Sequence, residues 1–183
     1  VRVYKWSGTA WSQFGTVDID GEAGVLTPPR VVSATTTVTS GVMGGISLSS
    51  TGQYQTACGE GHKLLISSNY GVNWRETSDT LTGSNYYYSC SISSTGQYQS
   101  FGNASGIIRI SSDFGNSWTY KLTSPTRSWR SISVSSTGQY QIAVVMGNNI
   151  WNSSDFGNNW TQRETSRSWM ACSLSSNGQY QTA

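Results

Sequence analysis

The sequence predicts an all-β fold built from four-stranded antiparallel units that repeat along the chain. Two observations carry this prediction. The string Gly-Gln-Tyr-Gln occurs four times, and its tyrosines are 44, 42 and 40 residues apart, at Tyr54, Tyr98, Tyr140 and Tyr180. A second string, Ser-Ser-(Asn/Asp)-aromatic-Gly-x-x-Trp, follows the first three copies, and its tryptophans are 44 and 42 residues apart, at Trp74, Trp118 and Trp160. Two independent markers with one period indicate a structural repeat.

Each repeat reads as four short strands. The first strand alternates apolar residues with serine, the pattern of a strand with two unlike faces, at 46–48, 90–92, 132–134 and 172–174. A Ser-(Thr/Asn)-Gly turn, in which glycine accepts a positive φ, leads into the second strand at Tyr-Gln. Third strands are expected at 63–66, 107–110 and around Ile150. The tryptophan string then forms a hairpin into the fourth strand, for example 118–122.

Four antiparallel strands repeated every 40–45 residues are typical of a β-propeller blade. The turn chemistry excludes a helical solenoid, whereas a β-sandwich stays as an alternative. We expect about four blades in this chain, or a fragment of a larger propeller. The predicted organisation is one domain, with an N-terminal hairpin at 1–17 that completes the last blade, a loop or linker at 18–44, and propeller blades at 45–183.

Composition limits the classes of partner. Only 11% of the residues are charged and the net charge is +2, which argues against a nucleic-acid partner. The longest clean apolar run has five residues, from Ile142 to Met146, so we expect no insertion into a membrane. Low charge with many serines, threonines and asparagines favours an extracellular setting or the surface of a virion or cell.

The tryptophan string resembles the Asp-box, or BNR, repeat, Ser-x-Asp-x-Gly-x-Thr-Trp. The first copy departs from the pattern, because Asn69 replaces the acid. Sialidases, sortilin-type receptors, some glucanases and a photosystem II assembly factor carry this box, and the resemblance implies a structural role for it. On that basis the structural residues here are Asn69, Gly71, Trp74, Asp113, Gly115, Trp118, Asp155, Gly157 and Trp160.

Large side chains precede the first strand of each repeat. The aligned positions hold Met43, Tyr87, Trp129 and Trp169, and two residues earlier lie Asn85, Arg127 and Arg167. Loops that enter the innermost strands of a propeller gather on one face near its axis, where ligands commonly bind. A ring of Tyr87, Trp129 and Trp169 with Arg127, Arg167 and Asn85 would stack on a sugar or anchor a protein. The alternative is that these aromatic side chains pack between blades.

Catalysis is not expected. The nine acidic residues show no pair at a suggestive spacing, and the Phe/Tyr-Arg-Ile-Pro motif of sialidases is absent. No spacing of cysteine or histidine indicates a metal, and we expect no cofactor.

The leading hypothesis is therefore a non-catalytic binding or structural module of an extracellular, cell-surface or viral assembly, which contacts a protein partner or copies of itself. A carbohydrate-binding lectin that uses the aromatic and arginine ring is the first alternative. A sialidase-like glycoside hydrolase fragment is the second.

Overall fold

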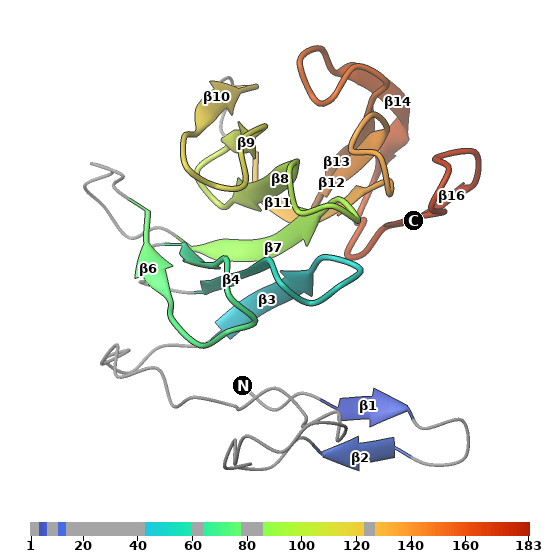
Figure 1. Cartoon of the computed structure of the whole chain (residues 1–183). Coiled ribbons are helices and arrows are strands. Elements are labelled where there is room, and N and C mark those ends of the chain that lie inside the picture. Colours follow the sequence, from blue (N-terminus) through green and yellow to red (C-terminus); the bar gives the residue numbers. More distant parts are fainter. Residues whose placement is uncertain (1–3, 7–10, 14–42, 60–63, 78–85, 123–126) are drawn as a thin grey trace, which may run out of the picture.

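The computed structural model describes residues 4–6, 11–13, 43–59, 64–77, 86–122 and 127–183, and all of its regular elements are β-strands (Figure 1). Three four-stranded antiparallel sheets follow one another along the chain. Blade 1 consists of β3 (Met43–Leu48), β4 (Gln55–Gly59), β5 (Leu65–Ser67) and β6 (Arg75–Glu76). Blade 2 consists of β7 (Tyr87–Ile92), β8 (Gln99–Asn103), β9 (Ile108–Ser111) and β10 (Thr119–Lys121). Blade 3 consists of β11 (Trp129–Val134), β12 (Gln141–Val145), β13 (Asn148–Ser153) and β14 (Thr161–Arg167).

Two further pairs of strands form separate two-stranded sheets. One pair is β1 (Tyr4–Trp6) with β2 (Trp11–Gln13), and the other is β15 (Ser173–Leu174) with β16 (Gln181–Thr182), called half-blade 4 below. The predicted completion of the last blade by the N-terminal hairpin stays a prediction, because among the described strands β1 pairs only with β2 and β15 only with β16. The first strand of blade 1 begins at Met43, and residues 14–42, most of the predicted linker, lie outside the described part.

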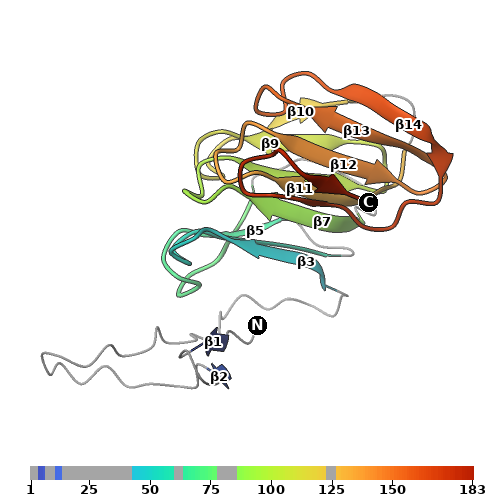
Figure 2. The ribbon, with the colours of Figure 1, turned by 90° about the vertical axis from the view of Figure 1, so that its right-hand side faces the viewer.

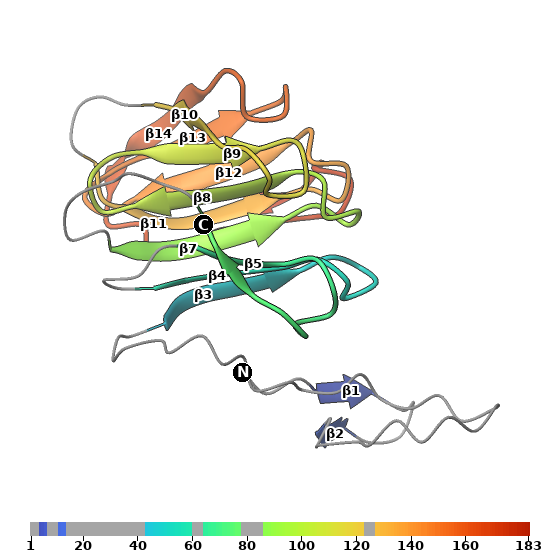
Figure 3. The ribbon, with the colours of Figure 1, turned by 60° about the vertical axis from the view of Figure 1, so that its left-hand side comes forward.

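The first strands of neighbouring blades lie side by side, with β7 between β3 and β11 (Figures 2 and 3). Serine hydroxyls connect them. The Ser47 hydroxyl accepts the backbone N–H of Ile92 at 3.2 Å, and the Ser91 hydroxyl accepts that of Val134 at 3.0 Å. The serines of the alternating pattern therefore face the neighbouring blade, where they satisfy backbone groups that the sheet ladders leave free.

A tyrosine on a glycine forms the junction between successive blades. The ring of Tyr98 in blade 2 covers Gly138 in the turn of blade 3 so closely that a Cβ on this glycine would lie 2.4 Å from the ring. Tyr54 covers Gly96 and Tyr140 covers Gly178 in the same way. Each of these glycines has a positive φ, so the turn and the junction require glycine at the same residue.

Serine also ties each turn to the next. The backbone N–H and the hydroxyl of Ser94 both donate to the carbonyl of Ser136, each at 2.9 Å. Ser50 donates twice to Ser94 in this way, and Ser136 donates twice to Ser176. The three junctions thus share the tyrosine–glycine contact and the paired donation from one serine to the carbonyl of the next.

The hydrophobic core lies between neighbouring blades. One cluster joins Cys58 and Leu64 of blade 1 to Tyr87, Cys90 and Phe101 of blade 2, and a second joins blades 2 and 3 around Trp129. The three cysteines are free thiols, and Cys58 and Cys90 behave as small buried apolar residues. Burial raises the pKa of the Cys172 thiol to about 11, which keeps it protonated at neutral pH.

The tyrosine-on-glycine contact predicts a position-dependent cost of adding a methyl group. Gly138→Ala and Gly147→Ala both place alanine at a positive φ, for about 1–2 kcal/mol of backbone strain. Only Gly138 meets a ring, since nothing lies within 4 Å of a Cβ on Gly147. We expect Gly138→Ala to lower the free energy of unfolding, measured by urea denaturation, by about 1–3 kcal/mol more than Gly147→Ala. Equal losses would contradict a tightly packed junction.

Candidate functional site

The tryptophan string folds into the same tight turn in each blade. In blade 2 the Ser111 hydroxyl accepts the N–H of Gly115 at 2.9 Å and donates to the Asp113 carboxylate at 2.8 Å. That carboxylate also accepts the N–H and the hydroxyl of Ser117, at 2.8 and 2.6 Å. The Trp118 indole N–H donates to the carbonyl of Gly115 at 3.2 Å. The Ser111 hydroxyl, the Asp113 carboxylate and the Trp118 indole N–H are thus all hydrogen-bonded inside the turn.

Blade 3 repeats this arrangement. The Asp155 carboxylate accepts the hydroxyl of Ser153 at 2.8 Å, and it accepts the N–H and side-chain amide of Asn159 at 2.8 and 2.6 Å. Desolvation alone would raise the pKa values of Asp113 and Asp155. The hydrogen bonds that each carboxylate accepts outweigh it and hold both pKa values below the usual range. Two ionised, fully engaged carboxylates suit a structural role and offer no proton to a substrate.

Blade 1 makes the turn with an amide. The Asn69 side-chain oxygen accepts the N–H of Asn73 at 2.9 Å, and the Trp74 indole donates to the carbonyl of Gly71 at 3.0 Å. In blade 3 the corresponding indole bond joins Trp160 to Gly157 at 2.9 Å. An amide oxygen therefore replaces a carboxylate oxygen without changing the main turn contacts.

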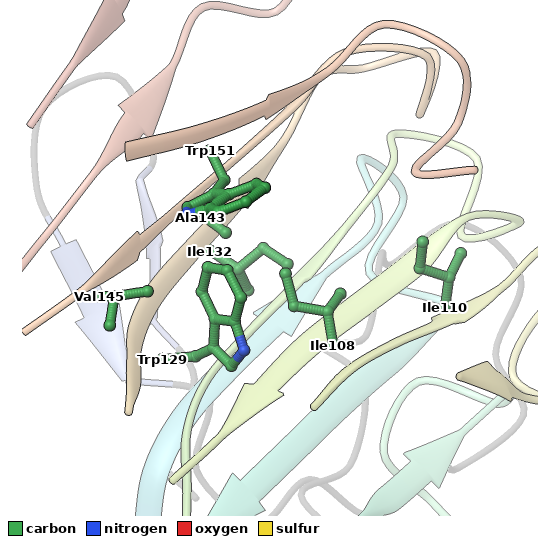
Figure 4. Close-up of a cluster of buried hydrophobic side chains, with 7 residues drawn as sticks. All are labelled: Ile108, Ile110, Trp129, Ile132, Ala143, Val145 and Trp151. Atoms are coloured by element: carbon green, nitrogen blue, oxygen red, sulfur yellow. The ribbon is translucent and has the colours of Figure 1, made fainter. Parts of the chain in front are cut away.

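Two members of the predicted ligand ring belong to the core. Trp129 is 1% exposed and lies with Ile108 of blade 2 and with Ile132 and Trp151 of its own blade (Figure 4). Tyr87 is 3% exposed and meets Phe101 edge to face, with ring centroids 5.4 Å apart. Burial raises the pKa of Tyr87 to about 12. Neither ring presents a face on which a sugar could stack, which favours the alternative interpretation, packing between blades.

The other predicted residues lie at the same end of the blades. Trp169 is half-buried, and the Arg167 guanidinium carbon is 6.0 Å from the centre of its ring. The Arg127 guanidinium lies over Trp151 at 4.5 Å. Asn85 lies outside the described residues. Of the predicted ring, Trp169, Arg127 and Arg167 therefore retain some exposure, while Tyr87 and Trp129 do not.

A β-bulge exchanges the buried and exposed positions at the start of each first strand. The register shifts between Met43 and Gly45 in blade 1, between Tyr87 and Ser89 in blade 2, and between Trp129 and Ser131 in blade 3. The additional residues, Tyr88 in blade 2 and Arg130 in blade 3, leave the ladder and are more exposed than their neighbours Tyr87 and Trp129. Met170 occupies the aligned position after Trp169.

The bulge residues meet across two blades. The Arg130 guanidinium lies over the ring of Tyr88 at 4.2 Å, and it approaches the sulfur of Met146 at 3.5 Å. Met146 and Met170 are exposed. We call the set Tyr88, Arg130, Met146, Trp169 and Met170 the start-face patch. Sequence analysis missed Tyr88, Arg130, Met146 and Met170, and the only signal for them was that a residue next to a predicted ring position carried a large side chain.

Other kinds of site find no support in the described part of the chain. No group of three histidine, cysteine, aspartate or glutamate side chains could hold a metal ion there. Within the same residues, no helix has the length and apolar character needed to cross a membrane.

Solved structures identify the fold. The structure of YCF48 bound to D1 peptide matches with a TM-score of 0.58 at 19% identity, over 68% of this chain and 42% of that one. The RRP9 WD40 repeats match with a TM-score of 0.61 at 13% identity, over 74% of this chain and 42% of that one. The GH74 enzyme of Niastella koreensis matches with a TM-score of 0.59 at 17% identity, over 74% of this chain and 25% of that one. The chain thus spans less than half the length of these structures.

No family model and no curated protein matches the sequence. The Asp-box assignment therefore stays a prediction. The repeated four-stranded sheets and their likeness to these propeller proteins show that the chain has an all-β propeller fold, as predicted; the described residues contain three complete blades and a half-blade.

The box carboxylates predict acid sensitivity. Because folding lowers their pKa values, Asp113 and Asp155 contribute stability that is fully present above the pKa of an unfolded aspartate, about 4, and is lost as the pH falls through the lower folded values. We expect the melting temperature of an Asp113→Asn/Asp155→Asn variant to fall less than that of wild type on acidification. Asn69→Asp should make the fall steeper. If the melting temperatures of all three proteins fell in parallel as the pH was lowered, this structural role of the carboxylates would be contradicted.

The burial of the Trp129 ring predicts that substitutions at Trp129 and at the adjacent Arg130 change the free energy of unfolding by very different amounts. Trp129→Ala should lower the free energy of unfolding by about 3–5 kcal/mol, because it leaves a cavity between blades 2 and 3. Arg130→Ala should cost no more than about 1 kcal/mol, the value of a partly exposed cation–π contact. Chemical denaturation of both variants measures the difference. A Trp129→Ala protein as stable as wild type would return the ring to the list of candidate ligand contacts.

Proposed function

We propose that this chain is a non-catalytic β-propeller module that binds a peptide segment of a protein partner at the start-face patch. One observation carries the proposal: Arg130, Tyr88 and Met146 form a continuous, partly exposed contact across two blades. Arginine and tyrosine dominate the binding energy of protein interfaces, and exposed methionines adapt to different partners.

The charge of the patch favours an acidic segment. Arg127, Arg130 and Arg167 lie at this end of blade 3, and a guanidinium forms bidentate hydrogen bonds with a carboxylate. Met146 lies against Arg130, Trp169 lies near Arg167, and Met170 follows Trp169 in the sequence with its side chain exposed. The fitting partner is therefore an exposed peptide that combines carboxylates with apolar side chains. The YCF48 propeller, which shares the fold, binds a peptide, and this supports the same class of partner here.

Two features support a role without catalysis. Asp113 and Asp155 are ionised and hold their turns, and the described glutamates, Glu76 and Glu164, are exposed on the fourth strands of blades 1 and 3. The likeness to GH74 enzymes extends to the fold and supplies no paired acid and base. We place the module in an extracellular, cell-surface or viral assembly, on the strength of its low content of charged residues.

A lectin is the second candidate, because half-buried Trp169 lies near Arg167, the last residue of β14 in blade 3. Such a pair could stack on a sugar ring and bind its hydroxyls. This version of the site uses Trp169 without Tyr87 or Trp129.

Selection from a displayed random-peptide library tests the proposal. We expect wild type to enrich peptides with carboxylates next to apolar residues. Arg130→Ala should lower the affinity for a recovered peptide by at least about tenfold. The control is Arg163→Ala, an exposed arginine on β14 outside the patch, which should bind as wild type.

The same proteins are then applied to a glycan array. Failure to enrich any peptide, or equal binding by Arg130→Ala, would overturn the peptide site. Glycan binding that Trp169→Ala abolishes, in a protein with an unchanged circular dichroism spectrum, would replace it with the lectin.

A further inference from the structure

Two free thiols meet across the junction between blades 1 and 2. Cys58 lies on β4 of blade 1 and Cys90 lies on β7 of blade 2, and the two side chains are hydrogen-bonded to each other. They are 1% and 7% exposed, and they belong to the apolar cluster between these blades. Neither thiol is part of the start-face patch or of a tryptophan-string turn, so the proposed function leaves this pair without a role.

The surrounding backbone brings the two cysteines close together. The Cys90 thiol donates to the carbonyl of Thr56, two residues before Cys58 on the same strand, at 3.5 Å. Gly45, the ladder partner of Cys58, lies against both cysteines. A Cβ on this glycine would lie 3.4 Å from the Cys58 sulfur and 3.3 Å from the Cys90 backbone nitrogen. Thiols that are already in hydrogen-bond contact can be bridged by changes of their side-chain torsions.

The junction between blade 3 and half-blade 4 offers an internal comparison. Cys172, the residue before β15, aligns with Cys90 and makes the same kind of contact. Its thiol donates to a strand carbonyl of the preceding blade, that of Ile142, at 3.7 Å. The strand register, however, places Val144 in blade 3 where blade 1 has Cys58. Cys172 therefore has the setting of Cys90 without a second thiol across the junction.

We propose that Cys58 and Cys90 form a disulfide that joins blades 1 and 2 when the chain folds in the presence of a small-molecule disulfide such as glutathione disulfide. The thiolate of one cysteine attacks the small disulfide, which releases one small thiol and leaves a mixed disulfide on the protein. The thiolate of the second cysteine displaces the other small thiol and forms the S–S bond. Two protein thiols are thus oxidised, one small disulfide is reduced to two small thiols, and these carry away the two protons.

Folding is the stage at which this reaction occurs. In an unfolded chain a cysteine is exposed to solvent and, with a pKa of about 8.5, supplies thiolate at mildly alkaline pH. In the folded protein the hydrogen bond with Cys58 and burial raise the pKa of Cys90 well above its usual value, which suppresses the reactive form. Secreted and cell-surface proteins fold in oxidising compartments, so the disulfide fits the proposed setting, but its formation does not depend on peptide binding.

Refolding the denatured chain in a mixture of reduced and oxidised glutathione tests the proposal. We expect the product to lose the mass of two hydrogen atoms, to leave only Cys172 reactive toward a thiol reagent in urea, and to yield after proteolysis a linked pair of peptides that contain Cys58 and Cys90. The oxidised protein should unfold at a higher urea concentration than the same protein refolded with a reductant, because the bridge restricts the unfolded chain. Circular dichroism checks that both forms are folded.

Two variants provide the controls. Cys172→Ala keeps both partners, so it should form the same bridge and have no reactive thiol afterwards. Cys90→Ala should form no internal disulfide, and its urea midpoint should be the same in oxidising and reducing buffer. Three reactive thiols in wild type after refolding in the oxidising mixture would overturn the proposal, and so would a linked pair that includes Cys172. The wild-type result decides the question even if Cys90→Ala fails to fold.

Discussion

The fold depends on the contact between a tyrosine and the glycine of the next blade's turn. A four-stranded sheet cannot bury both of its faces alone, so each blade needs a defined neighbour. The contact fixes the distance between blades, because any larger residue in place of Gly138 would meet the ring of Tyr98. Around it, the paired donations of Ser94 to Ser136 set the orientation of one turn against the next.

The glutamine at the end of Gly-Gln-Tyr-Gln explains why the two repeated strings keep one period. The amide of Gln99 donates to the carbonyl of Gly96 in its own turn, and its oxygen accepts the hydroxyl of Thr56 from the preceding blade. The same side chain lies against Gly115 of the tryptophan string. Turn, box and junction therefore meet at one buried side chain, and the spacing between the strings cannot drift independently.

Much of the fold could be predicted from the sequence, because turns and strand alternation are local properties. The period, the four strands and the antiparallel pairing all follow from short strings. The exposure of the candidate ring did not follow, since one bulge moves Tyr88 and Arg130 out of the ladder and leaves Tyr87 and Trp129 in the core. The proximity of Arg130 to Met146 depends on the hairpin that joins β12 to β13, which single-strand patterns do not describe.

Because the described junctions share the tyrosine–glycine contact and the serine pair and connect only adjacent units, we expect the stability of the described blades to be close to a linear sum of blade and junction terms. Such a system is quasi-one-dimensional. Folding can nucleate at any blade and propagate to its neighbours. Blades 2 and 3, which each have a neighbour on both sides within the described residues, are held by two junctions, so the amides of their core strands should exchange slowly.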